Sequence, residues 1–166
     1  MKRVAEKEDY LLYLVSEEGE RLPVMRSLML EQSVTVRNCL MMTKQGDNMI
    51  PIDKYSSHTL RLVIRWCEQH ESCKVPETAR EILDHTFSVQ LTPEEHALLG
   101  GDIVELKNLY EAAQYLEIMT LANAVARVAA DQIGKCASSE EMRTLLANFV
   151  DTLVTRDEAE EEGNAE

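Results

Sequence analysis

The nearest approach to a reactive or metal-binding site in this sequence is formed by Cys67, His70 and Cys73. Thiolate and imidazole groups are preferred zinc ligands, and a structural zinc site needs four of them. The spacing Cys-x2-His-x2-Cys supplies three and is not one of the usual zinc patterns. We therefore expect a buried thiol and two surface residues here rather than a metal site, and we expect no cofactor.

Other reactive side chains are scattered without a catalytic pattern. None of the four histidines accompanies a serine or cysteine in a recognised nucleophile signature. The acidic pairs at 94–95 and 140–141 stand at predicted helix starts, where carboxylates favour the helix dipole. The glycine pair at 100–101 lacks the lysine and the spacing of a phosphate-binding loop. We therefore expect a protein that is not an enzyme.

The composition narrows the class of partner. The chain has 166 residues with 30 acidic and 17 basic side chains, a net charge of −13. Nucleic acids and anionic membrane surfaces are disfavoured partners, because both require a basic surface. The opening "MKRVAEKEDY" has no apolar signal region, and no stretch reaches the length of a membrane span. We expect reduced cysteines and a cytoplasmic or nuclear location.

The elements that would position these residues begin with strands and continue as helices. We predict strands over residues 10–16 and 20–24, joined by a turn at Gly19, and a third over 49–53. Pro23 has no N–H to donate, so the second strand must lie at an edge. This order predicts an α+β fold with a small N-terminal sheet.

Helix starts are indicated by capping residues and by apolar spacing. We predict caps at Ser33, Ser56, Thr92, Asp102 and Ser138, the last with Glu141 at capping-box spacing. Residues 71–90 are predicted to be loop with at most one helical turn. We expect the eight methionines to fill the core, because they show no periodic clustering. The last ten residues hold six acids and no base, which predicts a disordered tail.

Four stretches, in the same order, resemble the Skp-type adaptors of SCF ubiquitin ligases. These stretches are "EQSVTVRNCL", "LRLVIRWCEQH", "LYEAAQYLEIMTL" and "GKCASSEEMRTLL", within a resemblance that runs from about residue 11 to 146. The second keeps the Trp66-Cys67 pair of the family's V-I-x-W-C-x-x-H helix. The resemblance implies a BTB/POZ-like fold over residues 1–118, partner-binding helices over 119–155 and an acidic tail over 156–166.

The resemblance also implies two partners and the residues that contact them. Family members hold a cullin through the BTB portion, which here places the contact at Val36, Asn38, Gln114 and Tyr115. They hold an F-box protein through the C-terminal helices, which here places that contact at Leu121, Val125, Val128, Ile133, Met142, Leu145, Leu146 and Phe149. A chain of this kind is expected to self-associate when it has no partner, because its apolar surface is then exposed.

The sequence departs from the family at three places. Gln114 replaces the family's asparagine, residues 71–90 replace a long acidic and proline-rich insert, and the C-terminus lacks the family's last tryptophan. These departures leave two hypotheses open. The chain is an adaptor that bridges a cullin and an F-box protein, or it is a structural subunit of another assembly, such as a kinetochore-type complex.

Overall fold

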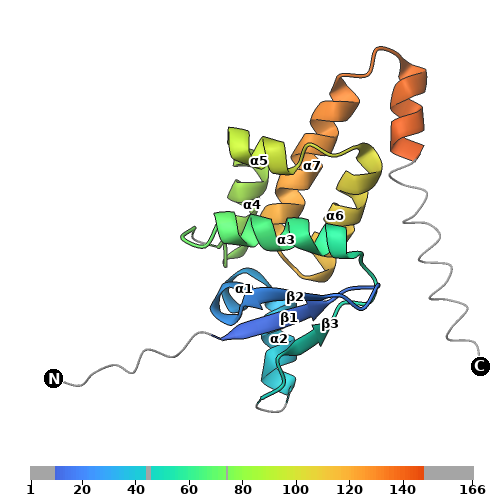
Figure 1. Ribbon diagram of the computed structural model, residues 1–166. Coiled ribbons are helices and arrows are strands. Elements are labelled where there is room, and N and C mark those ends of the chain that lie inside the picture. The colour runs from blue at the N-terminus through green and yellow to red at the C-terminus, as the bar shows by residue number, and fades with distance from the viewer. Residues whose placement is uncertain (1–9, 44–45, 74, 148–166) are drawn as a thin grey trace, which may run out of the picture.

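Three short strands form a sheet at one end of the molecule (Figure 1). The structure is a computed structural model and describes residues 10–43, 46–73 and 75–147. Strand β1 (Leu11–Val15) lies in the middle of the sheet, antiparallel to β2 (Arg21–Met25) and parallel to β3 (Met49–Pro51). The predicted hairpin and third strand are confirmed, and Pro23 lies on an edge strand as expected.

Helices pack against the sheet and share one core with it. In Figure 1, α3 lies between the sheet and the pair formed by α6 and α7. Residues 139–147 form a further helical segment, the terminal helix, which is separated from α7 by a short turn. The labelled helices are α1 (Arg26–Gln32), α2 (Val34–Met42), α3 (Ser57–Gln69), α4 (Ala79–Ser88), α5 (Pro93–Leu98), α6 (Ile103–Tyr115) and α7 (Met119–Gly134).

The helix starts follow the predicted caps. Ser33, Ser56 and Thr92 each accept a hydrogen bond from the backbone N–H three residues later. The Asp102 carboxylate accepts from the two N–H groups at the start of α6. Side-chain caps satisfy N–H groups that have no partner inside the helix, so they fix where each helix begins. All four predictions are confirmed.

Two helices were not predicted. Helix α4 occupies part of the stretch predicted as loop, and that prediction is wrong. The Thr78 hydroxyl accepts from the N–H of Glu81, and the Glu81 carboxylate accepts from the N–H of Thr78, which completes a capping box. Helix α1 continues directly from β2, and its first turn has no side-chain cap, so no local signal marks its start.

One apolar core joins the sheet to the helices, which confirms the α+β prediction. Alternate residues of β1 and β2 point inward, as the period of two in a strand requires. The inner face of α7 enters the same core as α3 and α6. Within the described ranges, no helix is both long enough and apolar enough to cross a membrane. The fully buried large side chains include Leu12, Leu14, Met29, Leu60, Leu106, Leu109, Leu116, Ile118 and Leu121.

Candidate partner-binding surfaces

The start of α2 is joined to the end of α6, although the two lie about 80 positions apart in the sequence. The buried Ser33 hydroxyl donates a hydrogen bond to the Leu116 carbonyl at 2.5 Å and also caps α2. The Thr35 hydroxyl donates to the Tyr115 carbonyl at 2.8 Å. These bonds fix the two segments that carry the predicted cullin contacts side by side.

Tyr115 presents part of its ring to solvent in a fixed orientation. The side chain is 38% exposed, and its ring centroid lies 5.7 Å from that of the buried Tyr55. The Lys54 ammonium lies 5.4 Å from the Tyr115 ring centroid, within the range of a cation–π contact. Tyr55 is itself held by a hydrogen bond from its hydroxyl to the Glu111 carbonyl. The exposed edge of Tyr115 is therefore a pre-ordered aromatic contact.

Gln114 is exposed, but its amide is already engaged. Its Nε2 group donates to the Tyr110 hydroxyl at 2.8 Å, one turn earlier on α6. The amide has two donor hydrogens and one acceptor oxygen, so part of its hydrogen-bonding capacity remains for a partner. The longer side chain of glutamine, compared with the family's asparagine, permits this contact within the helix.

The predicted contacts on α2 divide between the core and the surface. Val36 is completely buried, so any partner must approach through its neighbours, whereas Asn38 is exposed. Asn38 lies on a stripe whose members are spaced by three and four residues and so share one face of α2. We call this the outer face of α2: Val34, Asn38, Met41 and Met42, with Val34, Met41 and Met42 being 39%, 77% and 91% exposed.

The methionines contradict the prediction that they fill the core. Of those in the described part of the chain, only Met29 is buried. The others lie at the surface, because each falls on a helix face or strand position that points away from the core. Exposed methionines form adaptable apolar surfaces, and a partner gains by covering them. Those exposed are Met25, Met41, Met42, Met49, Met119 and Met142.

The predicted F-box contacts on α7 are mostly core residues. Leu121 and Val125 are fully buried and Val128 is 8% exposed, because these residues face α6 and the rest of the core. Ile133, near the end of α7, is half-buried. The part of α7 that remains available to a partner is therefore its C-terminal end rather than its whole length.

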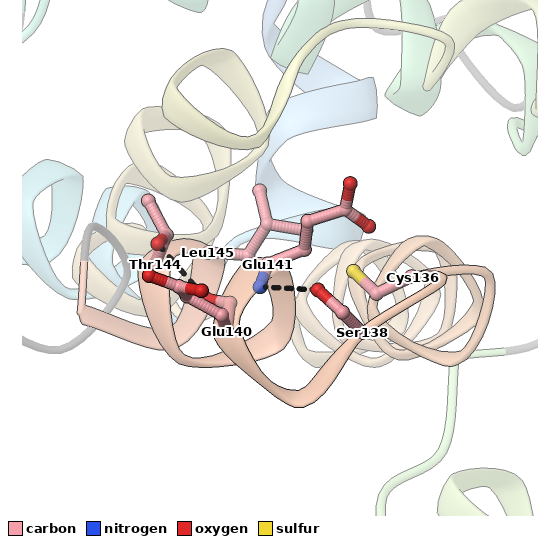
Figure 2. Close-up of a pocket in the computed structure, with 6 residues that line it drawn as sticks. All are labelled: Cys136, Ser138, Glu140, Glu141, Thr144 and Leu145. Carbon is pink, nitrogen blue, oxygen red and sulfur yellow. Dashed lines mark hydrogen bonds between the residues drawn. The ribbon is translucent and has the colours of Figure 1, made fainter.

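The terminal helix presents the more accessible apolar side chains. Its start follows the prediction, because the Ser138 hydroxyl accepts from the Glu141 N–H (Figure 2). Met142 is 37% and Leu146 is 41% exposed, while Leu145 packs partly against the core. The predicted contact at Phe149 and the predicted tail over 156–166 lie outside the described residues.

A cavity of about 570 Å³ lies at the junction of α7 and the terminal helix. Figure 2 shows its lining, which combines Cys136 from the turn after α7 with Ser138, Glu140, Glu141, Thr144 and Leu145. The cavity is next to the exposed side chains of the terminal helix.

Of the group Cys67, His70 and Cys73, the thiol of Cys67 is buried and Cys73 is exposed, as predicted, but His70 is not a surface residue, because its side chain is only 15% exposed. Cys67 is fully buried, and burial raises the pKa of its thiol to about 12, with a smaller effect from the Glu68 charge. The His70 ring stacks on Trp66, and its Nε2 lies 2.5 Å from a Glu95 carboxylate oxygen. Across the described ranges, no group of three or more His, Cys, Asp or Glu is placed to hold a metal ion.

Comparison with known proteins finds distant relatives among SCF subunits. The E3 ubiquitin ligase complex SCF subunit sconC of Arthroderma benhamiae is 28% identical over 131 residues, 78% of each chain. The sconC subunit of Arthroderma otae is 27% identical over 131 residues and the same share of each chain. Suppressor of kinetochore protein 1 of Schizosaccharomyces pombe is 28% identical over 132 residues, 78% of this chain and 80% of that protein. No model of a protein family matches the chain.

A small three-stranded sheet followed by packed helices defines an α+β protein, consistent with the BTB/POZ-like fold that the sequence predicts. The chain is a distant homologue of the Skp-type subunits of SCF ubiquitin ligases.

Proposed function

We propose that this protein is a non-catalytic adaptor that joins a cullin to an F-box protein in an SCF-type ubiquitin ligase of the cytoplasm and nucleus. The observation that carries the proposal is the homology to SCF subunits, together with two separate exposed apolar surfaces. The first consists of the outer face of α2 with Gln114 and Tyr115. The second consists of the terminal helix with the end of α7.

The cullin surface would use Tyr115 as its anchor. A pre-ordered aromatic side chain loses little conformational entropy on binding, which is why such residues are frequent hot spots. The methionines on the outer face of α2 would supply apolar area around it, and Asn38 would supply a polar contact. Val36 would act indirectly, because it is buried and supports the helix that carries these side chains.

The F-box surface would use Met142 and Leu146, with Ile133 at its margin. Complete burial of a Leu or Met side chain contributes about 1.5–3 kcal/mol, so a few such residues can hold a stable complex. Leu121, Val125 and Val128 would support this surface from inside the core, and Phe149 would extend it. Unpartnered, the same surface would favour self-association of the chain.

The experiment measures binding of the full chain to a cullin and to an F-box protein from its own source, one partner at a time. Tyr115→Lys is expected to abolish cullin binding and to leave F-box binding unchanged. Leu146→Asp is expected to abolish F-box binding and to leave cullin binding unchanged. Leu146 is chosen because a change at Leu145 would disturb the core more. Tyr10→Lys changes a tyrosine that is 51% exposed and far along the chain from either surface, and is the matched control.

Normal binding of both partners by both variants would refute the assignment of the surfaces. A wild-type chain that binds an F-box protein but no cullin would favour the second candidate, a structural subunit of a non-ligase assembly. One observation favours this candidate: the name of one relative, Suppressor of kinetochore protein 1, refers to a kinetochore protein and not to a ligase. Affinity purification from the native source, with the copurified proteins identified by mass spectrometry, separates the two.

A further inference from the structure

An open groove of about 550 Å³ lies on the side of the molecule where α4 approaches α1 and α2. One wall comes from Gln32, Val34 and their neighbours, and the other from the segment that leads into α4. The junction between α6 and α7 closes one end through Glu117 and Met119. The second wall belongs to residues 71–90, where the sequence departs from the Skp family. The groove is therefore a property of this chain. It meets the outer face of α2 at Val34, and its lining includes neither Gln114 nor Tyr115 nor any residue of the terminal helix.

The groove has an apolar floor that is open to solvent. Its apolar side chains are Val34, Val75, Pro76, Ile82 and Met119, all half-buried or exposed. Val34 is 39% and Met119 is 43% exposed, so the groove does not enclose its contents. An open apolar trough suits an extended chain segment better than a small molecule, which needs a cavity that surrounds it.

The rim of the groove is acidic. Its described charged residues are Glu31, Glu77, Glu117 and Arg37. All three glutamates are exposed, and no ion pair joins their carboxylates to a base within the described ranges. The Arg37 guanidinium offsets one of these three negative charges, and its donors are engaged by the Leu30 carbonyl at 2.8 Å and the Glu31 carbonyl at 3.3 Å. The described rim therefore keeps an excess of negative charge. Lysine or arginine side chains at the ends of a bound segment would therefore find carboxylates.

Glu117 stands at this rim with an unusual backbone. Its φ of +52° is in the left-handed region, and it is the only described residue other than glycine that has a positive φ. Glycine would adopt this conformation without the steric cost that a side chain carries. The chain thus places a carboxylate at a position where local geometry favours glycine.

We propose that this groove binds a short segment of a partner protein in which apolar residues are flanked by lysine or arginine. The apolar residues would cover Val75, Pro76 and Met119, and the bases would pair with Glu77 and Glu117. Binding would weaken as salt rises, because exposed charge pairs are screened. The inference concerns a surface that shares only Val34 with the proposed cullin surface, and it holds whether or not the chain binds a cullin.

The test begins with selection of 12-residue peptides from a random display library on the full chain. Enriched peptides are expected to combine apolar residues with lysine or arginine. A synthetic copy of the strongest, measured by fluorescence anisotropy, is expected to bind at least tenfold more weakly to the double variant Glu77→Lys, Glu117→Lys. Met119→Ser is expected to weaken binding without any change of charge. Glu17→Lys, in the β1–β2 turn, carries the same type of charge change away from the groove and is expected to bind normally.

A second readout locates the peptide. Cys73 is exposed and lines the groove, whereas Cys39 is exposed on α2 and does not. Bound peptide is expected to slow alkylation of Cys73 and to leave that of Cys39 unchanged. The proposal is overturned if no peptide is enriched, if the double variant binds as well as the wild type, or if Cys73 is not protected. It is also overturned if Tyr115→Lys or Leu146→Asp abolishes peptide binding, which would assign the peptide to the surfaces of the proposed function.

Discussion

Ser33 connects the two segments that carry the proposed cullin contacts. Its replacement by alanine tests how much this connection contributes to the free energy of unfolding. The hydroxyl accepts from the Val36 N–H at 3.1 Å and donates to the Leu116 carbonyl at 2.5 Å, and the residue is completely buried. Loss of a serine cap costs about 1 kcal/mol. A buried carbonyl left without its donor costs about 1–3 kcal/mol more. Ser33→Ala is therefore expected to lower the free energy of unfolding by about 2–4 kcal/mol.

The control is Thr35→Val, which removes the neighbouring hydrogen bond to the Tyr115 carbonyl and keeps the shape of the side chain. That bond is exposed, so water can replace the lost donor, and the expected cost is below about 1 kcal/mol. Equilibrium urea denaturation, followed through the fluorescence of the single tryptophan, Trp66, measures both variants. This indole is buried at 3% exposure and stacks on His70, so unfolding changes its surroundings. Equal costs for the two variants would refute the reasoning, because Ser33→Ala removes a buried hydrogen bond and the cap of α2, whereas Thr35→Val removes one exposed hydrogen bond.

Three further predictions concern single groups. Hydrogen bonds from its own backbone N–H and from the start of α3 lower the pKa of Glu18 from 4.5 to about 2. The ionised Glu18 carboxylate therefore stabilises the fold fully above pH 4.5, and this stabilisation is lost as the pH falls to about 2. In thermal melts, the melting temperature of Glu18→Gln should fall less between these pH values than that of the wild type. Under native conditions at pH 8, Cys67 should resist alkylation while Cys39 and Cys73 react. Peptide mass mapping measures the labelling of each cysteine, and early labelling of Cys67 would contradict its burial. Glu117→Gly should raise the free energy of unfolding by up to about 2 kcal/mol. Glycine removes the steric strain of the left-handed backbone, and this gain exceeds the extra conformational entropy that glycine loses on folding. A lower melting temperature of the variant would contradict this prediction.

The parts of the fold that were predicted correctly depend on contacts between residues close in the sequence. The caps at Ser33, Ser56, Thr92 and Asp102 each bond to a backbone N–H two or three residues away, so type and spacing reveal them. Helix α4 obeyed the same rule through Thr78 and Glu81, and its capping box was readable but overlooked. Helix α1 has no side-chain cap, and no local pattern could have located it.

A sequence pattern does not predict whether an apolar helix face is buried or exposed. The stripe of α7 was visible as an apolar repeat, but a repeat does not say whether another part of the same chain or a partner covers it. Packing against α6 decided this for Leu121 and Val125, which are buried. The exposed methionines on α2 were missed for the converse reason: methionine is apolar, and only the direction of the helix face showed that they point to solvent.

By itself, the sequence determined the α+β class, the edge position of Pro23 and most helix starts, and it supplied the resemblance to the Skp-type subunits. These follow from backbone geometry and from local hydrogen bonds, which depend on near neighbours. Only the tertiary structure joined Ser33 to Leu116, buried Val36 and brought Glu31, Glu77 and Glu117 to one groove. Such contacts depend on how distant elements pack in three dimensions, and no spacing along the chain encodes them.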